Sequence, residues 1–247
     1  MIASQTIKQF RVVENHQESS QIFTLTLIPR SVEDTVTFRA GQWVFLHLYD
    51  EEGSTWKAPF SLANAPEEST DGRLELTIKI YKEFTLRASR LVADDIVGIQ
   101  GPFGAFFPPE NAKALVIFAG GIGITPFSSM VRSWARQADL GQETPKVTLF
   151  YSGRHEEDLL FMETFRRIAK TWADFTFVPT LTGEDAPSSW PSERGRIHRE
   201  MVQKYVTDLS ACSFLACGKQ DFVEGIKLLL AHDDVDIKTR FKAEAFG

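Results

Sequence analysis

The chain has 247 residues, 43% of them hydrophobic, which is long enough for two domains with separate cores. Its net charge of −6, without any block of Lys or Arg, argues against nucleic-acid binding through the phosphates. The two cysteines, Cys212 and Cys217, are too few for a disulfide framework or a four-cysteine iron–sulfur cluster, and a reducing cytoplasm is the expected compartment.

The first half of the chain reads as short strands between turn residues. Leu25 and Leu27 alternate with threonines, and Leu74 and Leu76 alternate with polar residues, which is the period of a half-buried strand. The predicted strands are residues 21–28, 43–49, 74–81 and 96–99. Many short strands with little helix predict an antiparallel β-barrel domain over residues 1–108.

After Pro108 and Pro109 the pattern changes to alternating strands and helices. The predicted strands are residues 114–119, 146–151, 175–179, 213–216 and 238–243, and the predicted helices are residues 126–137, 156–172, 197–206 and 221–231. This alternation predicts a doubly wound, Rossmann-like parallel sheet in a second domain over residues 109–247. The longest apolar run is well short of the roughly 20 residues of a membrane-spanning helix, so no membrane span is expected.

A glycine-rich run joins the strand at 114–119 to the helix that follows it. Its residues are Gly120, Gly121, Ile122, Gly123, Ile124, Thr125 and Pro126. Glycines let the backbone approach a pyrophosphate, and free N–H groups at a helix start attract anionic oxygen. A tight turn without a ligand would use the same residues. The G-x-G-x-x-G spacing is absent, and Ser152 and Arg154 stand where an acidic residue would follow the next strand, which disfavours a standard Rossmann dehydrogenase.

Four segments, in order, resemble motifs of the ferredoxin–NADP reductase-like family of oxidoreductases. They are Lys57-Ala58-Pro59-Phe60-Ser61 for the flavin motif R-x-Y-S, Gly101-Pro102-Phe103-Gly104 for G-P-x-G, Gly120 to Pro126 for the nucleotide turn, and Cys217-Gly218 for the pair beside the nicotinamide. The ending Glu244-Ala245-Phe246 also matches the family's acidic-x-aromatic ending. The resemblance covers nearly the whole chain. It implies a flavin-binding barrel followed by an NAD(P)-binding domain, with FAD and NAD(P)H as cofactors.

For the flavin, the resemblance implies that Phe60 packs on the isoalloxazine ring, Ser61 hydrogen-bonds near its N5 atom, and Lys57 contacts the pyrophosphate. In this alignment Lys57 takes the place of the motif's Arg and Phe60 takes the place of its Tyr. The alternative for Phe60 is that it only packs in the core. Thr85 either contacts the flavin phosphates or only caps the helix predicted to run to Leu91. Further candidate flavin contacts are Ala58, Pro59, Ile78, Lys79 and Phe84.

For the nicotinamide, the resemblance implies that Cys217 and Gly218 lie beside the ring, Glu244 relays a proton or polarises the site, and Phe246 covers the flavin face. The alternatives are a buried hydrophobe for Cys217, a solvated carboxylate for Glu244, and a disordered chain end for Phe246.

At the adenosine end, the candidate contacts are Ser152, Arg154 and Arg196. A basic residue there would bind the 2′-phosphate of NADPH, whereas Gly183 stands where some family members carry an Arg, which slightly favours NADH. As the alternative, Arg154 pairs with Glu157 or Asp158 on the surface.

The expected function is that of an NAD(P)H-dependent flavoprotein reductase that passes electrons to a separate acceptor, such as a ferredoxin-like protein or an oxygenase component. Reduction of free flavin or a quinone is the nearest alternative, and a non-redox nucleotide-binding regulatory module is another. The five histidines show no metal-ligand spacing, so no metal is expected.

Overall fold

The computed structural model describes residues 6–49, 55–232 and 235–246, which group into two compact units. The first unit takes the described residues up to Ala105 together with Ser128–Ser133, and the second takes Phe106–Phe127 and the described residues from Trp134 onward. The domain boundary between residues 108 and 109 stays a prediction.

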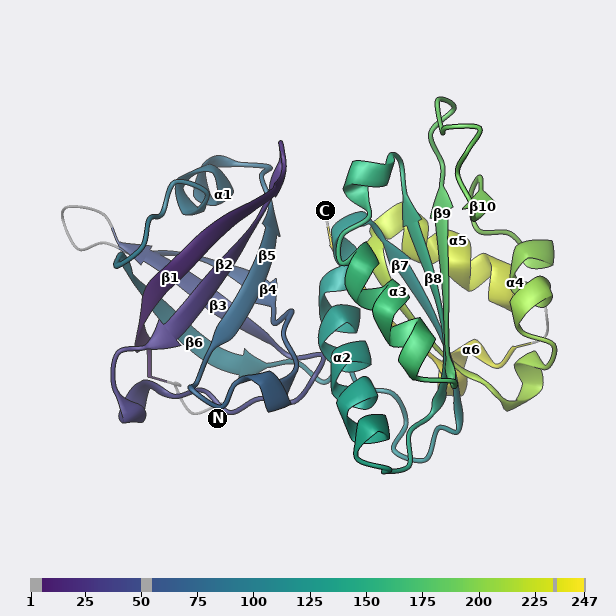
Figure 1. Ribbon diagram of the computed structural model, residues 1–247, viewed down its shortest axis with the longest axis horizontal. Coiled ribbons are helices and arrows are strands. Elements are labelled where there is room, and N and C mark those ends of the chain that lie inside the picture. The colour runs from purple at the N-terminus through teal and green to yellow at the C-terminus, as the bar shows by residue number, and fades with distance from the viewer. Residues whose placement is uncertain (1–5, 50–54, 233–234, 247) are drawn as a thin grey trace. The chain divides into compact units, whose positions relative to one another are not determined.

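Six strands form the antiparallel sheet of the first unit (Figure 1). Their bounds are β1 Lys8–Ser19, β2 Ile22–Pro29, β3 Trp43–Tyr49, β4 Thr55–Ser61, β5 Leu74–Lys79 and β6 Ile96–Phe103. Neighbours follow the order β4-β3-β6-β1-β2-β5, and a short helix, α1 (Glu83–Ala88), follows β5. Leu25, Leu27, Leu74 and Leu76 are fully buried in one core, as their alternation predicts.

Two of these strands, β1 and β4, were not identified from the sequence. The second half of β1 is polar and mostly exposed, so it lacks the alternation that marks a strand, although it pairs with β2 along its length. β4 contains Pro59, which has no N–H for a ladder hydrogen bond. The proline is tolerated because β4 lies at the end of the strand order, with β3 as its neighbour.

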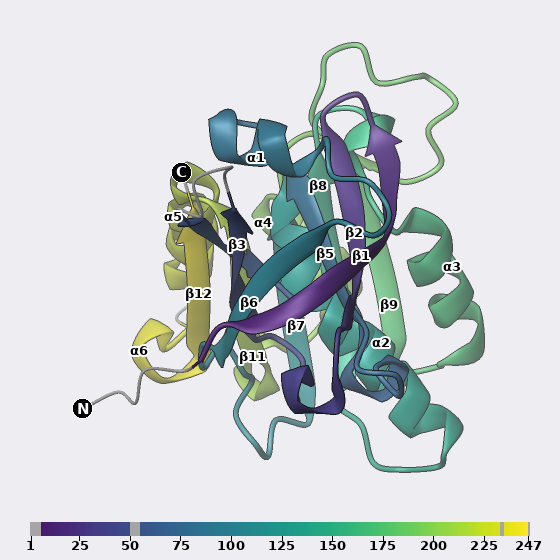
Figure 2. The same ribbon diagram turned by 90° about the vertical axis from the view of Figure 1, so that its left-hand side faces the viewer.

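The second unit is a parallel sheet with helices on both faces. The strands are β7 Ala114–Gly120, β8 Lys146–Gly153, β9 Phe175–Leu181, β10 Glu193–Arg194, β11 Ser213–Lys219 and β12 Phe241–Phe246. The helices are α2 Thr125–Asp139, α3 Met162–Thr171, α4 Arg199–Tyr205, α5 Gln220–Ala231 and α6 Ile237–Arg240. Figures 1 and 2 show α3 on one face and α4 and α5 on the other. The predicted fold class is therefore confirmed.

The strand order β10-β9-β8-β7-β11-β12 contains one reversal of direction. The chain moves outward from β7 to β10 and then returns to place β11 on the other side of β7. In open parallel sheets, ligands bind beyond the carboxyl ends of the two strands at such a switch point. Those ends are Gly120 of β7 and Lys219 of β11.

Two predicted elements of this unit were wrong in their detail. The helix predicted over 156–172 is a single 3-10 turn, Glu156–Asp158, followed by α3, because Phe161 adopts a left-handed conformation with φ of 58°. The strand predicted over 238–243 begins as α6, because the Asp236 carboxylate accepts the N–H of Lys238 and caps a short helix.

Candidate functional site

The two ends of the segment that resembles the flavin motif lie on opposite faces of β4. Phe60 is paired with Val44, whose side chain is fully buried in the core. Lys57 is paired with His47 on the other face, where its Nζ lies 4.5 Å from the ring centre of Phe45. The structure therefore does not bring Lys57 and Phe60 together.

On the face of β4 that holds Phe60, the preceding side chain, two residues earlier in the sequence, is uncharged. Ala58 is paired with Leu46 of the core and lies on this face, whereas Pro59 and Ser61 lie on the face of Lys57. In the motif R-x-Y-S the Arg stands two residues before the Tyr. With Phe60 at the Tyr position, the Arg position is occupied by Ala58.

Phe60 forms an aromatic pair with Phe84 of α1. Their ring centres are 6.0 Å apart and the ring planes differ by 24°, which is a stacked arrangement. Both rings are half-buried and pack against the core of the first unit, so part of each remains accessible. A planar flavin ring can pack against an accessible aromatic surface of this kind, so the residues present fit a flavin.

Thr85 lies in the first turn of α1 rather than at its N-cap. The helix begins at Glu83, with Lys82 as the N-cap, and ends at Ala88, so the helix predicted to run to Leu91 is shorter than expected. The Thr85 hydroxyl accepts the N–H groups of Tyr81 at 2.9 Å and Lys82 at 3.1 Å. The hydroxyl thus closes the turn before the helix.

The two candidates on β5 differ in what they can reach. Ile78 is buried in the core and supports the strand from inside. Lys79 lies on the outer face, half-exposed, with its Nζ 5.9 Å from the ring centre of Tyr81. Of these two, Lys79 is the one that an anionic ligand can reach.

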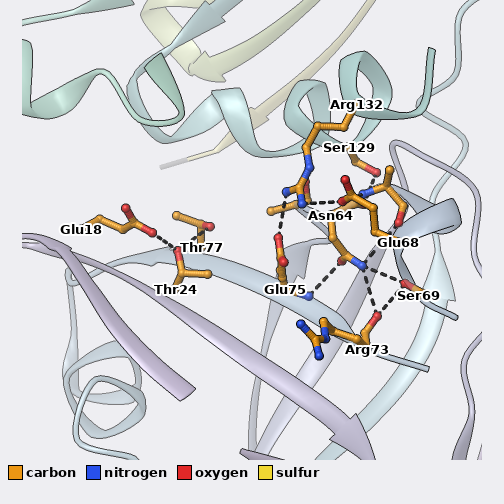
Figure 3. A network of polar contacts seen from close by, with 12 residues as sticks. Glu18, Thr24, Asn64, Glu68, Ser69, Arg73, Glu75, Thr77, Ser129 and Arg132 are labelled. Atoms are coloured by element: carbon orange, nitrogen blue, oxygen red, sulfur yellow. Dashed lines mark hydrogen bonds and ion pairs between the residues drawn. The ribbon is translucent and has the colours of Figure 1, made fainter. Parts of the chain in front are cut away.

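A buried asparagine fixes the loop that follows Ser61 (Figure 3). The side-chain amide of Asn64 donates to Ser69 Oγ at 2.8 Å and to the carbonyl of Arg73 at 3.1 Å. Its side-chain oxygen accepts the N–H of Glu75 at 2.9 Å, and its backbone carbonyl accepts a hydrogen bond from Ser129 Oγ at 2.7 Å. The chain therefore leaves β4 in one defined direction.

Arg132 extends this network within the first unit. Its guanidinium forms ion pairs with Glu68 and with Glu75, the latter at 2.8 Å, while its side chain is 17% exposed. Burial alone would lower the pKa of Arg132, but the carboxylates of Glu75 and Glu68 outweigh it and leave the pKa raised. Sequence reasoning missed this network, because Arg132 and Glu75 are 57 residues apart and no local pattern links them.

The glycine-rich turn occupies the carboxyl end of β7. Gly121 has a φ of 53°, a left-handed conformation that favours glycine, and a Cβ there would meet open space. Thr125 Oγ donates to the carbonyl of Ile122 at 3.2 Å, and Pro126 lies in the first turn of α2, where no N–H is needed. The open backbone at Gly121 is where a phosphate oxygen can approach, so the turn fits a dinucleotide.

The other two glycines of the turn are required by packing. A Cβ on Gly123 would lie 2.3 Å from the carbonyl oxygen of Cys217, and one on Gly120 would lie 2.9 Å from the ring of Phe222. The turn thus combines two glycines that packing requires with one, Gly121, at which a Cβ would meet open space.

Cys217 and Glu244 are direct neighbours on the parallel strands β11 and β12. Burial, and to a smaller extent the charge of Glu244, raises the pKa of Cys217 well above its usual range. Burial also raises the pKa of Glu244. At neutral pH Cys217 is therefore an uncharged thiol, and Glu244 keeps its proton to a higher pH than an exposed glutamate does.

Phe246 belongs to β12, where it is paired with Lys219, and it is half-exposed. Gly218 is buried, and a Cβ on it would lie 2.6 Å from the ring of Phe222.

A cavity of about 460 Å³ lies at the carboxyl ends of β8, β9 and β11. Its lining includes Ser152, Thr182, Arg196, Lys219, Asp221 and Phe222. The structure brings the predicted residues Ser152 and Arg196 together here. Arg154 is exposed and does not line this cavity, and among the described residues it forms no ion pair with Glu157 or Asp158.

Lys219 was missed by sequence reasoning, although it directly follows Cys217 and Gly218 at the same edge of the sheet. Counting one residue past that pair would have identified it.

Comparison with known proteins gives two family matches and several relatives. Residues 9–107 match the oxidoreductase FAD-binding domain, and residues 117–227 match the oxidoreductase NAD-binding domain. A subunit of the Na(+)-translocating NADH-quinone reductase of Idiomarina loihiensis is 26% identical over 195 residues, 72% of this chain and 47% of that protein. The reductase component of phenol 2-monooxygenase of a Pseudomonas species is 30% identical over 165 residues, 65% of this chain and 44% of that protein.

This chain thus spans about half the length of these curated relatives. Among solved structures, a ferredoxin NADP+ reductase from Neisseria gonorrhoeae with bound FAD and NADP has a TM-score of 0.79 at 20% identity, covering 97% of this chain and 98% of that chain. The two domain matches confirm the predicted cofactors, FAD and NAD(P)H. In the described part of the chain, none of the helices has the length and apolar character needed to cross a membrane.

Proposed function

Because the chain belongs to the ferredoxin–NADP reductase-like family of NAD(P)H-dependent flavoprotein oxidoreductases, we propose that it delivers electrons from NAD(P)H, by way of FAD, to a separate acceptor. The acceptor class is a ferredoxin-like protein or an oxygenase component. The observation that carries the proposal is the meeting of the glycine turn with Cys217 and Gly218 at the switch point of the parallel sheet.

When bound, FAD would supply the hydride and one-electron redox chemistry. The protein supplies binding, orientation and exclusion of water. The residues that would hold the flavin ring are Phe60, supported by Phe84, and Ser61 at the end of β4. Lys79 and the start of α1 around Thr85 would meet the phosphates, and Lys57 stays a candidate from the other face of β4.

On the second unit, the backbone at Gly121 and the Thr125 hydroxyl would hold the pyrophosphate of NAD(P)H. Cys217, as an uncharged thiol, would give the nicotinamide a neutral wall, because a thiolate there would attract the positive charge of the oxidised ring. Glu244 can hold or give up a proton beside it, and Phe246 offers a half-exposed ring at the same edge.

A separate acceptor is supported by composition and by the relatives. These 247 residues contain two cysteines, so an iron–sulfur acceptor must lie outside them. One relative is by name a reductase component of a monooxygenase. Another is by name part of an NADH-quinone reductase, which favours direct quinone reduction as the second candidate.

The test compares acceptors under anaerobic conditions. The FAD-loaded protein is first reduced with NAD(P)H and then mixed with a ferredoxin, with the ferredoxin-like component of an oxygenase, or with a water-soluble quinone. We expect the protein acceptors to reoxidise the flavin faster than the quinone does. Rapid reoxidation by quinone alone would favour the second candidate and contradict the proposed acceptor class.

A further inference from the structure

The four residues that follow Ser61 form a buried segment. They are Leu62, Ala63, Asn64 and Ala65, all of them 0% exposed. The N–H of Leu62 donates to the carbonyl of Gln42 at 3.0 Å, and the N–H of Ala63 donates to the carbonyl of Glu75 at 2.9 Å. Because Ser61 is the last residue of β4, these contacts set the path of the backbone beyond it.

Arg132 contacts this segment both directly and through Glu68. Its guanidinium donates to the carbonyl of Ala63 at 3.3 Å. The same guanidinium forms an ion pair with Glu68, whose carboxylate accepts the N–H of Ala65 at 3.0 Å. Arg132 thus holds the backbone on both sides of Asn64, and Figure 3 shows its side chain beside Asn64 and Glu68.

The charged groups of this network are shielded from water. The side chains of Arg132, Glu68 and Glu75 keep between 17% and 22% of their surface exposed. Partial burial strengthens the attraction between the charges, and the planar guanidinium directs its hydrogen bonds at fixed angles. The contacts of Arg132 therefore hold the segment Leu62–Ala65 in one position.

The Ser61 hydroxyl is available to a ligand. The side chain is half-buried, and within the described residues its hydroxyl forms no hydrogen bond. The ladder between β3 and β4 ends where Ser61 is paired with Trp43. Ser61 is therefore fixed by the strand on one side and by the buried segment on the other, and a shift of that segment would move the hydroxyl.

We propose that Arg132 is a positioning residue for flavin reduction, because it holds the segment after Ser61 so that the Ser61 hydroxyl meets the flavin ring in one place. This inference rests on the proposed function, since it concerns the same flavin. Arg132 acts through Ser61 and not by contact with the flavin. Reaction rates depend strongly on such alignment, and a misplacement of about 1 Å can slow a reaction by about 100-fold.

The first test measures the segment itself in the full chain without flavin. Hydrogen–deuterium exchange is followed by mass spectrometry in peptides that cover residues 61–69. We expect Arg132→Met to increase early deuterium uptake there several-fold, because the segment opens more often. Val12→Ala is the matched control, since it trims a fully buried side chain on β1 and destabilises the same unit. Its early uptake in residues 61–69 should equal that of the parent.

The second test is a double-variant cycle on the FAD-loaded full chain, in which stopped-flow absorbance follows reduction of the bound flavin by saturating NADH or NADPH. Ser61→Ala and Arg132→Met should each slow the reduction by about tenfold. The double variant should be no slower than Ser61→Ala alone, because Arg132 acts through the Ser61 hydroxyl. Val12→Ala should be reduced at the parent rate.

A milder variant covers the case in which Arg132→Met does not fold. Glu68→Gln weakens the same ion pair and leaves Arg132 in place, so it should give the same pattern to a smaller extent. A thermal melt and the visible absorption of bound flavin verify that each variant is folded and loaded.

Rate losses that multiply in the double variant would overturn the positioning role and leave the proposed function intact. The same holds for early exchange in residues 61–69 that is equal in Arg132→Met and Val12→Ala. A parent chain that binds FAD but is reduced by neither dinucleotide would overturn the proposed function, and the role of Arg132 in flavin reduction with it.

Discussion

The backbone of Gly123 lies directly against that of Cys217, so closely that a Cβ on Gly123 would be 2.3 Å from the Cys217 carbonyl oxygen. This contact joins the glycine turn after β7 to the end of β11. The two segments are 94 positions apart, by subtraction of their residue numbers, and each was singled out by its own motif. Their close packing explains why the third glycine of the turn tolerates no side chain.

Gly123→Ala should destabilise the folded chain by about 1–3 kcal/mol, because the added methyl group meets backbone that cannot turn away. Chemical denaturation of the full chain measures the loss. The matched control is Gly225→Ala, where a Cβ meets open space within α5. That variant should be as stable as the parent or gain about 1 kcal/mol from the better helix propensity of alanine. Equal destabilisation by the two substitutions would contradict the packing argument.

Phe60→Ala should weaken FAD binding more than Lys57→Ala does. Phe60 lies on the face of β4 that it shares with Phe84, and Lys57 lies on the other face beside Phe45. Removing the ring takes away stacking worth about 1 kcal/mol or more, so we expect an affinity loss of about fivefold to tenfold. Phe60→Tyr, which keeps the ring, is the control. Flavin fluorescence during titration of the apoprotein gives the affinities. A larger loss of affinity for Lys57→Ala than for Phe60→Ala would contradict this prediction and support a contact between Lys57 and the pyrophosphate.

These positions show what the sequence alone could and could not predict. The order of the motifs predicted both cofactors, and the strand and helix periodicities predicted both folds. Pro59 is unusual in a strand, so β4 was not predicted and the role of Lys57 was assigned without it. Side chains along a strand alternate between its two faces, which places Ala58 rather than Lys57 on the face of Phe60. A one-residue shift along a strand moves a side chain to the opposite face.

Contacts between distant residues could not be predicted from one sequence. The sequence around Arg132 contains no pattern that indicates pairing with Glu75, and the sequence around Glu75 contains none that indicates Arg132. Only folding brings the two residues together. The same holds for Lys219 and Arg196, which approach one cavity from β11 and from the loop after β10. Periodicity reports which face a residue occupies but not which distant residue it meets.

Glu244→Gln should raise the melting temperature near pH 8 and have little effect near pH 4. Burial raises the pKa of Glu244 in the folded chain above its value in the unfolded chain. Between these two pKa values the folded state holds more protons than the unfolded state, so stability falls as pH rises through this window. A glutamine at this position does not titrate, so the variant does not lose stability in this way as the pH rises. The control is Glu157→Gln, which removes one carboxylate from an exposed position outside β12. A pH-independent effect at Glu244 would contradict the burial of its carboxylate.

Arg132→Met should cost about 3 kcal/mol of stability, because it leaves the half-buried carboxylates of Glu68 and Glu75 without their cation. The comparison is Arg166→Ala, which removes an exposed pair with Glu163 and should cost less than about 1 kcal/mol. Denaturant unfolding of both variants provides the two values. Similar small costs would show that the network in Figure 3 contributes little to stability.

The most direct test of the central claim is anaerobic reduction of the purified chain. After reconstitution with FAD and removal of free flavin, the protein should be yellow and should lose its visible flavin absorption when NADPH or NADH is added in stoichiometric amount. Gly123→Ala should slow this loss by disturbing the nucleotide turn while the bound flavin remains. A protein that retains no FAD, or whose flavin absorption is unchanged by both dinucleotides, would contradict the account and leave a nucleotide-binding module without redox activity.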